Sequence, residues 1–112
     1  MSIQSAEIND FLEGDFVRSF GDGEERIYEF DKNKIEVVNK PDFNGNPARV
    51  LRYHVRDVNS MANTFKMWDV SRMHRNIYKE LMEGNGGKGW KVMKVRREGL
   101  MKKTTYHCEG VQ

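Results

Sequence analysis

The clearest alternation of apolar and polar residues runs from Ala48 to Val58. Successive side chains of a strand point to opposite sides. The apolar side of this segment would carry Leu51, Tyr53 and Val55. The other side would be largely basic, with Val50, Arg52, His54 and Arg56. This period of two predicts a half-buried strand with a basic outer face.

Shorter segments with a similar pattern predict further strands, separated by turn-forming residues. Counting the first, the predicted strand regions are 25–39, 48–58, 64–70, 89–97 and 104–111. Region 25–39 is either a hairpin or one long bent strand, since Asp31–Asn33 can turn the chain. The next turn is the most strongly indicated, because Asn44-Gly45 is a favoured hairpin dipeptide.

One amphipathic helix is predicted between the third and fourth strand regions. Ser71 is a good N-cap, because its hydroxyl can accept a hydrogen bond from an unpaired N–H of the first turn. Apolar residues at helical spacing follow it, namely Met73, Ile77, Tyr78 and Leu81. Gly84 is a natural stop, and the glycine-rich run 84–89 indicates a flexible loop.

This order of elements predicts a mostly β fold, a five-stranded Greek-key barrel with one helix between strands 3 and 4. That is the layout of the OB-fold, although an SH3-like barrel or an α+β sheet with one packed helix fits almost as well. The 112 residues contain no repeat or linker, so we expect one domain over residues 14–112. Residues 1–13 are expected to form an N-terminal arm or a short helix.

The expected location is the cytoplasm, or the host-cell cytoplasm if the protein is viral. No apolar run approaches the roughly 20 residues that a membrane span needs, so no membrane partner is expected. The segment Met1–Asp10 lacks the features of a secretory signal. The single cysteine, Cys108, leaves no internal disulfide to form.

The net charge of +2 conceals an uneven distribution along the chain. Residues 1–47 carry 11 acidic and 5 basic side chains, whereas residues 48–112 carry 6 acidic and 14 basic ones. If the two parts pack side by side, one face would be acidic and another basic. A segment with a net charge of +8 attracts polyanions.

Side-chain sets that indicate an enzyme or a metal site are missing from the sequence. His107 and Cys108 are neighbours on a predicted strand, so they face opposite sides and cannot form a dyad. No CxxC, HxxxH or HExxH spacing occurs. The loop Gly84–Gly89 follows a helix and precedes a strand, the reverse of a phosphate-binding P-loop. The sequence therefore predicts a non-enzymatic protein without a cofactor or metal.

The C-terminal region interleaves aromatic and basic residues on a predicted hairpin, from Trp90 to Tyr106. Bases stack on aromatic rings and phosphates pair with cations, so such a ribbon suits single-stranded nucleic acid. The alternative is a solvated amphipathic hairpin whose Trp90 and Tyr106 belong to the core.

Alternation assigns the side chains of this hairpin to two faces. The inward set is Met93, Val95, Thr104, Tyr106 and Cys108. The outward set is Lys94, Arg96, Thr105 and His107. Arg97 falls in phase with the inward residues, so we expect it to reach the barrel rim or to pair with Glu98 or Glu109.

The same hairpin resembles the last hairpin of OB-fold single-stranded DNA-binding proteins from tailed phages and archaeal viruses. The resemblance rests on Arg97-x-Gly99, a short turn and Thr104-x-Tyr106, and on the helix opened by Ser71. It covers roughly residues 64–111, and Met101 and Lys103 depart from the family pattern. It implies an OB-fold that binds single-stranded DNA, and it is compatible with a homo-oligomer and with replication or recombination partners.

The sequence thus predicts a non-enzymatic protein that binds single-stranded nucleic acid with low sequence specificity, with DNA favoured over RNA. Cations would neutralise phosphates, and rings of tyrosine or tryptophan, Tyr106 among them, would stack on bases. The candidate residues are Arg49, Arg52, Tyr53, His54, Arg56, Lys66, Trp68, Lys88, Trp90, Lys91, Lys94, Arg96, Lys102 and Lys103. For Trp68 a buried position is the favoured of two strand phases, since large aromatics fill small barrels.

The alternative function is a protein–protein interaction module, of viral or mobile-element origin, with no nucleic-acid role. Its acidic first half would bind or mimic a partner, and seven methionines would supply adaptable apolar surface.

Overall fold

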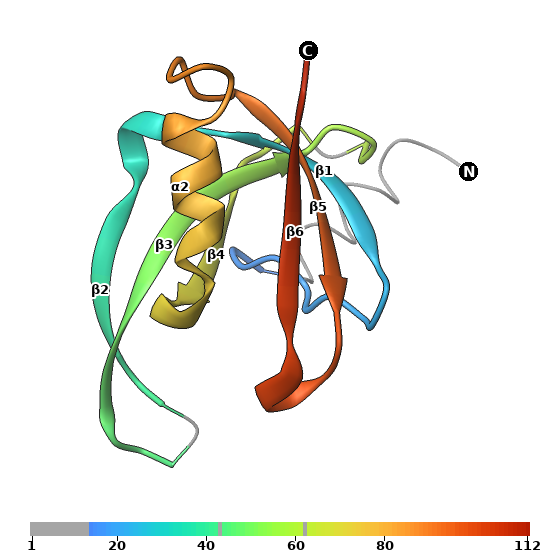
Figure 1. Ribbon diagram of the computed structural model, residues 1–112. Helices are drawn as coiled ribbons and strands as arrows, with labels where there is room; N and C mark the ends of the chain where they lie inside the picture. Colours follow the sequence, from blue (N-terminus) through green and yellow to red (C-terminus); the bar gives the residue numbers. More distant parts are fainter. Residues whose placement is uncertain (1–13, 43, 62) are drawn as a thin grey trace.

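The computed structural model describes residues 14–112 except Phe43 and Ala62, and within that range it is a mostly β protein with one helix (Figure 1). The strands are β1 (Glu25–Phe30), β2 (Glu36–Pro41), β3 (Pro47–Asp57), β4 (Lys66–Ser71), β5 (Val92–Glu98) and β6 (Thr105–Val111). The helix is α2 (Arg75–Glu83), and the short 3-10 turns are η1 (Lys32–Lys34), η2 (Arg72–His74) and η3 (Met101–Lys103). The predicted arm at residues 1–13 lies outside the described residues.

The long strand β3 organises a single antiparallel sheet. β4 pairs with one edge of β3, and β2 and β1 pair end to end along the opposite edge. β1 then pairs with β5, and β5 with β6. The predicted region 25–39 is therefore neither a hairpin nor one strand, because η1 divides it into two strands that both pair with β3. The sheet has six strands instead of the predicted five, and it is open.

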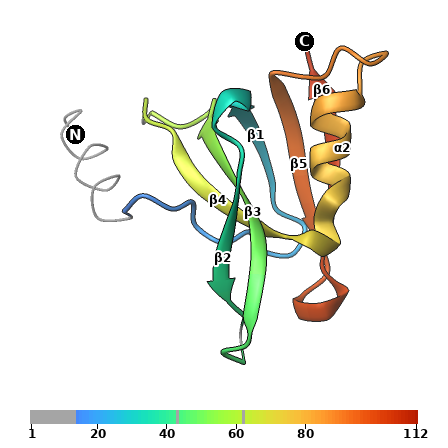
Figure 2. The same ribbon diagram turned by 90° about the vertical axis from the view of Figure 1, so that its left-hand side faces the viewer.

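The core lies between the curved sheet and α2, which packs beside β6 (Figures 1 and 2). Tyr53 and Val55 of β3 are buried, as are Met93 and Val95 of β5. Both period-two predictions are thus confirmed. From α2, Ile77 and Leu81 are completely buried.

The N-terminal end of the predicted helix differs from the expectation. Ser71 does accept a hydrogen bond from the Met73 N–H (3.3 Å), but it caps the 3-10 turn η2, and α2 begins only at Arg75. Met73 is consequently 63% exposed instead of packing on the core. Tyr78 is also exposed, which places both residues outside the buried face that the spacing predicted.

The segment 15–24, which we call the strap, runs past the open edge of the sheet. Asp15 and Val17 exchange backbone hydrogen bonds with Met67 of β4 (2.7 and 2.9 Å). The ring of Phe20 inserts between Trp68 and Tyr106, with centroid distances of 5.5 and 5.6 Å. The strap therefore fills the space between β4 and β6.

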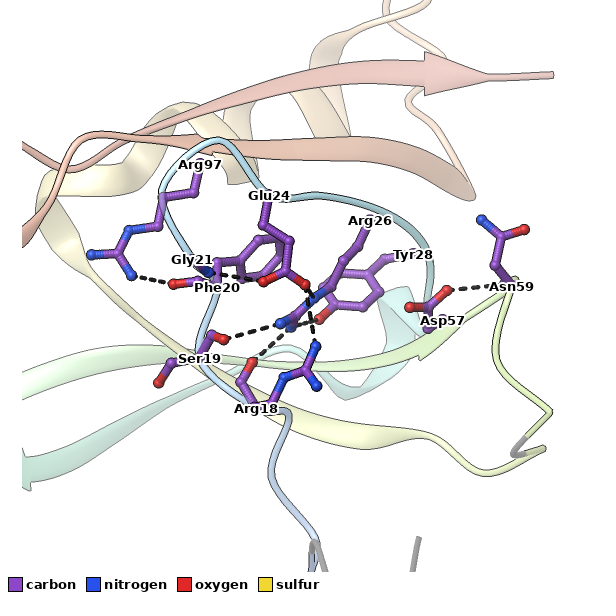
Figure 3. A network of polar contacts seen from close by, with 10 residues as sticks. All are labelled: Arg18, Ser19, Phe20, Gly21, Glu24, Arg26, Tyr28, Asp57, Asn59 and Arg97. Atoms are coloured by element: carbon purple, nitrogen blue, oxygen red, sulfur yellow. Dashed lines mark hydrogen bonds and ion pairs between the residues drawn. The ribbon is translucent and has the colours of Figure 1, made fainter. Parts of the chain in front are cut away.

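The buried side chain of Arg26 holds the strap in place (Figure 3). Arg26 is only 8% exposed and donates to the carbonyl oxygens of Arg18 (2.7 Å) and Ser19 (3.0 Å). It also donates to the Tyr28 hydroxyl and the Glu24 carboxylate, each at 2.8 Å. Because all these acceptors surround one buried guanidinium, Arg26 is a structural residue.

Candidate nucleic-acid interface

The outer face of β3 carries the predicted basic side chains, but each arginine is held by a carboxylate. Arg52 donates two hydrogen bonds to Asp69, at 2.7 and 3.0 Å. Arg56 donates two to Glu29, at 3.0 and 2.8 Å. His54 lies 3.9 Å from Glu36. The outer face of β3 is therefore oriented as predicted, but its arginines are already paired with carboxylates.

These pairs arise because the acidic and basic parts of the chain interleave in one sheet. Glu29 of β1 stands opposite Arg56, and Asp69 of β4 stands opposite Arg52. The hydrogen bonds from Arg52 hold the pKa of Asp69 below its usual range, and those from Arg56 do the same for the pKa of Glu29. The expected separation into an acidic and a basic face does not occur here.

The outward cations near β5 are also paired, but more loosely. Lys94 lies 3.4 Å from Glu109, Arg96 lies 2.7 Å from Glu98, and Lys91 lies 3.4 Å from Glu29. Thr105 and His107 face outward beside them, as predicted. Exposed ion pairs of this kind contribute about 0–1 kcal/mol, so these cations can exchange a carboxylate for a phosphate at small cost.

Arg97 does not pair with Glu98 or Glu109 as expected. Its guanidinium donates to the carbonyl oxygens of Phe20 and Gly99 and to the Thr104 hydroxyl. It thus ties the strap to the β5–β6 turn. Arg97 and Thr104, two residues on which the family resemblance rests, are engaged in holding the hairpin.

Two of the predicted stacking residues are buried. Tyr53 is 1% exposed and Trp68 is 6% exposed, so neither ring offers a face to a ligand. The indole N–H of Trp90, which precedes β5, donates to Glu80 at 2.9 Å, and its ring lies against Gly110. Tyr106 is half-buried between Phe20 and His74. Burial corrects the use of Tyr53 and Trp68 as stacking residues, and it confirms the inward face predicted for Tyr53 and the buried position favoured for Trp68.

A groove of about 350 Å³ lies between the β2–β3–β4 part of the sheet and the start of α2. Its floor is formed by apolar and aromatic side chains: Val37, Val50, Leu51, Tyr53, Val70 and Tyr78. Its polar lining consists of Arg49, Ser71, Arg72, His74 and Arg75. Arg49 and Arg72 also line an adjoining hollow under the β2–β3 turn. We call the first cavity the arginine groove.

The three arginines of the groove differ from Arg52 and Arg56 in having no carboxylate partner within the described part of the chain. Arg49, Arg72 and Arg75 are all exposed. Beside them the ring of Tyr78 is 41% exposed, and Val37 is 65% exposed. The groove thus combines unpaired cations with an accessible ring and apolar surface, which is the combination that bases and phosphates require.

The local sequence explains why these cations gather here. η2 and the first turn of α2 bring together Arg72, His74 and Arg75, and the first turn contains no acidic residue. The amino end of a helix favours negative charge, so the positive charges of Arg72 and Arg75 there do not stabilise the helix. Arg72 and Arg75 were missed by the sequence analysis, and cations at a position where acids are expected could have revealed them.

The remaining candidates lie away from the arginine groove. Lys88 lies in the loop after α2, at the opposite end of the helix from the groove (Figure 1). Lys66 begins β4, whereas Ser71 at the end of that strand reaches the groove. Lys102 and Lys103 lie in η3 at the exposed tip of the β5–β6 hairpin. Of the predicted site residues, the structure places Arg49 on the groove rim and Tyr53 in its floor.

Residues 14–42, 44–61 and 63–112 contain no group of three or more His, Cys, Asp and Glu side chains that could hold a metal ion. Burial raises the pKa of the half-buried Cys108 thiol to about 12, which keeps it protonated near neutral pH.

In the described part of the chain, no helix has the length and apolar character that crossing a membrane requires. Comparison of the chain with protein-family models, with curated proteins and with solved structures found no match.

Proposed function

We propose that the protein is a non-enzymatic binder of single-stranded nucleic acid, and that the strand lies in the arginine groove. The observation that carries this proposal is the contrast in pairing among the arginines. Arg49, Arg72 and Arg75 surround an apolar floor without a carboxylate partner in the described residues, while Arg52 and Arg56 are each held by one.

The chemistry of the groove favours a single strand over a duplex. Guanidinium groups bind phosphate oxygens through two parallel hydrogen bonds, so the three arginines can follow a phosphate backbone. The exposed ring of Tyr78 and the apolar floor can receive an unstacked base. A duplex keeps its bases stacked inside and would use only the arginines.

The pairing order of the strands supports a finer assignment to a partly open OB barrel. If β1 and β2 count as one bent strand interrupted by η1, the pairings of β3, β4, β5 and β6 follow a five-stranded arrangement with α2 between strands 3 and 4. The strap would occupy the opening of that barrel. The resemblance of Arg97–Tyr106 to phage and archaeal-virus proteins favours DNA over RNA.

Equilibrium binding to fluorescently labelled oligonucleotides tests the proposal. Single strands of DNA and RNA of about 12–16 nucleotides, and a DNA duplex of the same length, are titrated at low salt. The full-length protein is expected to bind single strands more tightly than the duplex. The double substitution Arg72→Ala/Arg75→Ala should weaken single-strand binding about 10- to 100-fold, because each arginine–phosphate hydrogen bond contributes roughly 0.5–1.5 kcal/mol.

The matched control is Lys34→Ala/Lys88→Ala, which removes the same charge at the opposite end of α2. When both variants are compared with wild type at about 0.15 M salt, where charges more than roughly 8 Å apart are largely screened, the affinity of this control should stay within about twofold of wild type, because neither lysine lines the groove. Equal reductions in both variants would show that only net charge matters. Absence of binding to any oligonucleotide at low salt would refute the proposal and favour the interaction-module alternative.

A further inference from the structure

A second hollow, of about 260 Å³, adjoins the arginine groove between β4 and the β5–β6 hairpin. Val70, Ser71 and His74 line both cavities, so the two adjoin each other. Aromatic and apolar walls of the second hollow come from Trp68, Tyr106 and Met101. A strand in the arginine groove therefore passes the mouth of this hollow.

Two residues that line the hollow, His74 and Tyr106, carry polar groups without a hydrogen-bond partner in the described residues. The Tyr106 hydroxyl and the ring nitrogens of His74 make no hydrogen bond there, and every buried side-chain nitrogen or oxygen atom among those residues has one. Solvent must therefore reach both groups. Their rings meet edge to face with centroids 4.8 Å apart. In contrast, the guanidinium of Arg97, which also lines the hollow, donates hydrogen bonds to Phe20, Gly99 and Thr104.

These two groups suit a base edge better than a phosphate. Burial, with a smaller contribution from Arg97, lowers the pKa of His74, so the ring is neutral at pH 7. A neutral imidazole offers one donor and one acceptor, and a tyrosine hydroxyl offers both. Donors and acceptors without charge match the edges of nucleobases, whereas the phosphates find full positive charge in the neighbouring groove.

We propose that this hollow receives one unstacked nucleobase of the bound strand, and that the Tyr106 hydroxyl and the His74 ring read its hydrogen-bonding edge. The inference rests on the proposed function of the arginine groove and adds to it. Binding along the groove tolerates any sequence, while one position of the strand has a base preference set by Tyr106 and His74.

The test compares two substitutions that each remove one hydroxyl. Tyr106→Phe keeps the ring that packs on Phe20 and Trp68 and deletes only the hydroxyl. The control, Thr105→Val, deletes the hydroxyl of the exposed neighbouring residue, which lines neither cavity. Affinities are measured for homopolymers of dT, dC and dA of one length at one salt concentration.

The readout is the ratio between the tightest and the weakest homopolymer. Tyr106→Phe should reduce this ratio by about three- to tenfold, the size expected for one hydrogen bond, and Thr105→Val should leave it unchanged. His74→Ala, in the turn η2, should also reduce this ratio, because it removes the imidazole that lines the hollow.

Two results distinguish failure of this inference from failure of the proposed function. An unchanged ratio in both Tyr106→Phe and His74→Ala, with binding retained, would overturn the base-reading role and leave the arginine groove in place. Failure of wild-type protein to bind any homopolymer would overturn both proposals together.

Discussion

The outer face of β3 and the arginine groove carry similar numbers of arginines, yet their guanidinium groups do different things. On β3, Arg52 and Arg56 each donate two hydrogen bonds to one carboxylate. In the groove, Arg72 and Arg75 meet no acid in the described residues. Positive charge in a sequence is therefore not the same as positive charge available to a ligand.

The difference follows from what surrounds each arginine. The Asp69 side chain is only 7% exposed, so its carboxylate needs nearby donors to offset its reduced hydration. Arg52 and Lys40 supply them. Two of the groove arginines, Arg72 and Arg75, lie at the amino end of α2, where the helix dipole does not stabilise positive charge. The ion pairs of Arg52 and Arg56 stabilise the fold, whereas Arg72 and Arg75 make no ion pair in the described residues.

Substitution of Arg26, which donates four hydrogen bonds, should have the largest effect on the free energy of unfolding. Arg26→Met removes donors from Tyr28, Glu24 and the two strap carbonyls while keeping most of the apolar stem. Breaking a buried charged network of this kind costs about 3–5 kcal/mol. Urea denaturation measures the free energy of unfolding, and a decrease below about 1 kcal/mol would show that the strap is not held by Arg26.

A smaller destabilisation is expected on the outer face of β3. Arg52→Ala leaves the nearly buried Asp69 with Lys40 alone, at a cost of about 1–3 kcal/mol. In a double-mutant cycle, Asp69→Asn should recover part of that stability, because the unpaired carboxylate is gone. Additive effects in the cycle would mean that the two side chains do not interact.

The strap also predicts a pH dependence of stability. Hydrogen bonds from Arg26, then from the Gly21 N–H, lower the pKa of Glu24 from 4.5 to about 2. Because the folded-state pKa lies below the unfolded one, this contribution is complete above pH 4.5 and disappears as the pH falls towards 2. The melting temperature of Glu24→Gln should therefore fall less steeply than that of wild type across this window. Parallel profiles would contradict the prediction.

The smallest effect on stability is expected in the groove, and its sign is opposite. Arg75→Ala removes a cation from the first turn of α2, where no folding contact in the described residues holds it. Thermal unfolding should show a change within about 0.5 kcal/mol, on the stabilising side. Clear destabilisation would place Arg75 among the structural arginines.

The local parts of this fold were predictable from sequence. Alternation in 48–58 identified the buried and outer faces of β3, and alternation in 92–98 did the same for β5. The break between β1 and β2 was indicated at Asp31–Asn33, but the pairing of these strands was not predictable, because both pair with β3 and not with each other. Neither was the strap, whose carbonyls are bound by Arg26 and Arg97 from other elements.

The candidate site was only partly predictable, for a related reason. Whether Arg52 is free depends on its register opposite Asp69, 17 residues away along the chain. Alternation gives the direction of a side chain but not its partner across the sheet. Arg72 and Arg75 could have been found from the sequence, because they lie just before and at the start of a helix whose first turn contains no acidic residue.

The salt dependence of single-strand binding tests the central claim most directly. If Arg49, Arg72 and Arg75 each contact a phosphate, the logarithm of the affinity should fall with the logarithm of salt concentration with a slope of about −2, at roughly 0.7 per phosphate neutralised. Arg72→Ala/Arg75→Ala should reduce the magnitude of the slope by about 1.4, and Lys34→Ala/Lys88→Ala should leave it unchanged. A wild-type slope near zero, or an unchanged slope in the groove variant, would contradict the account.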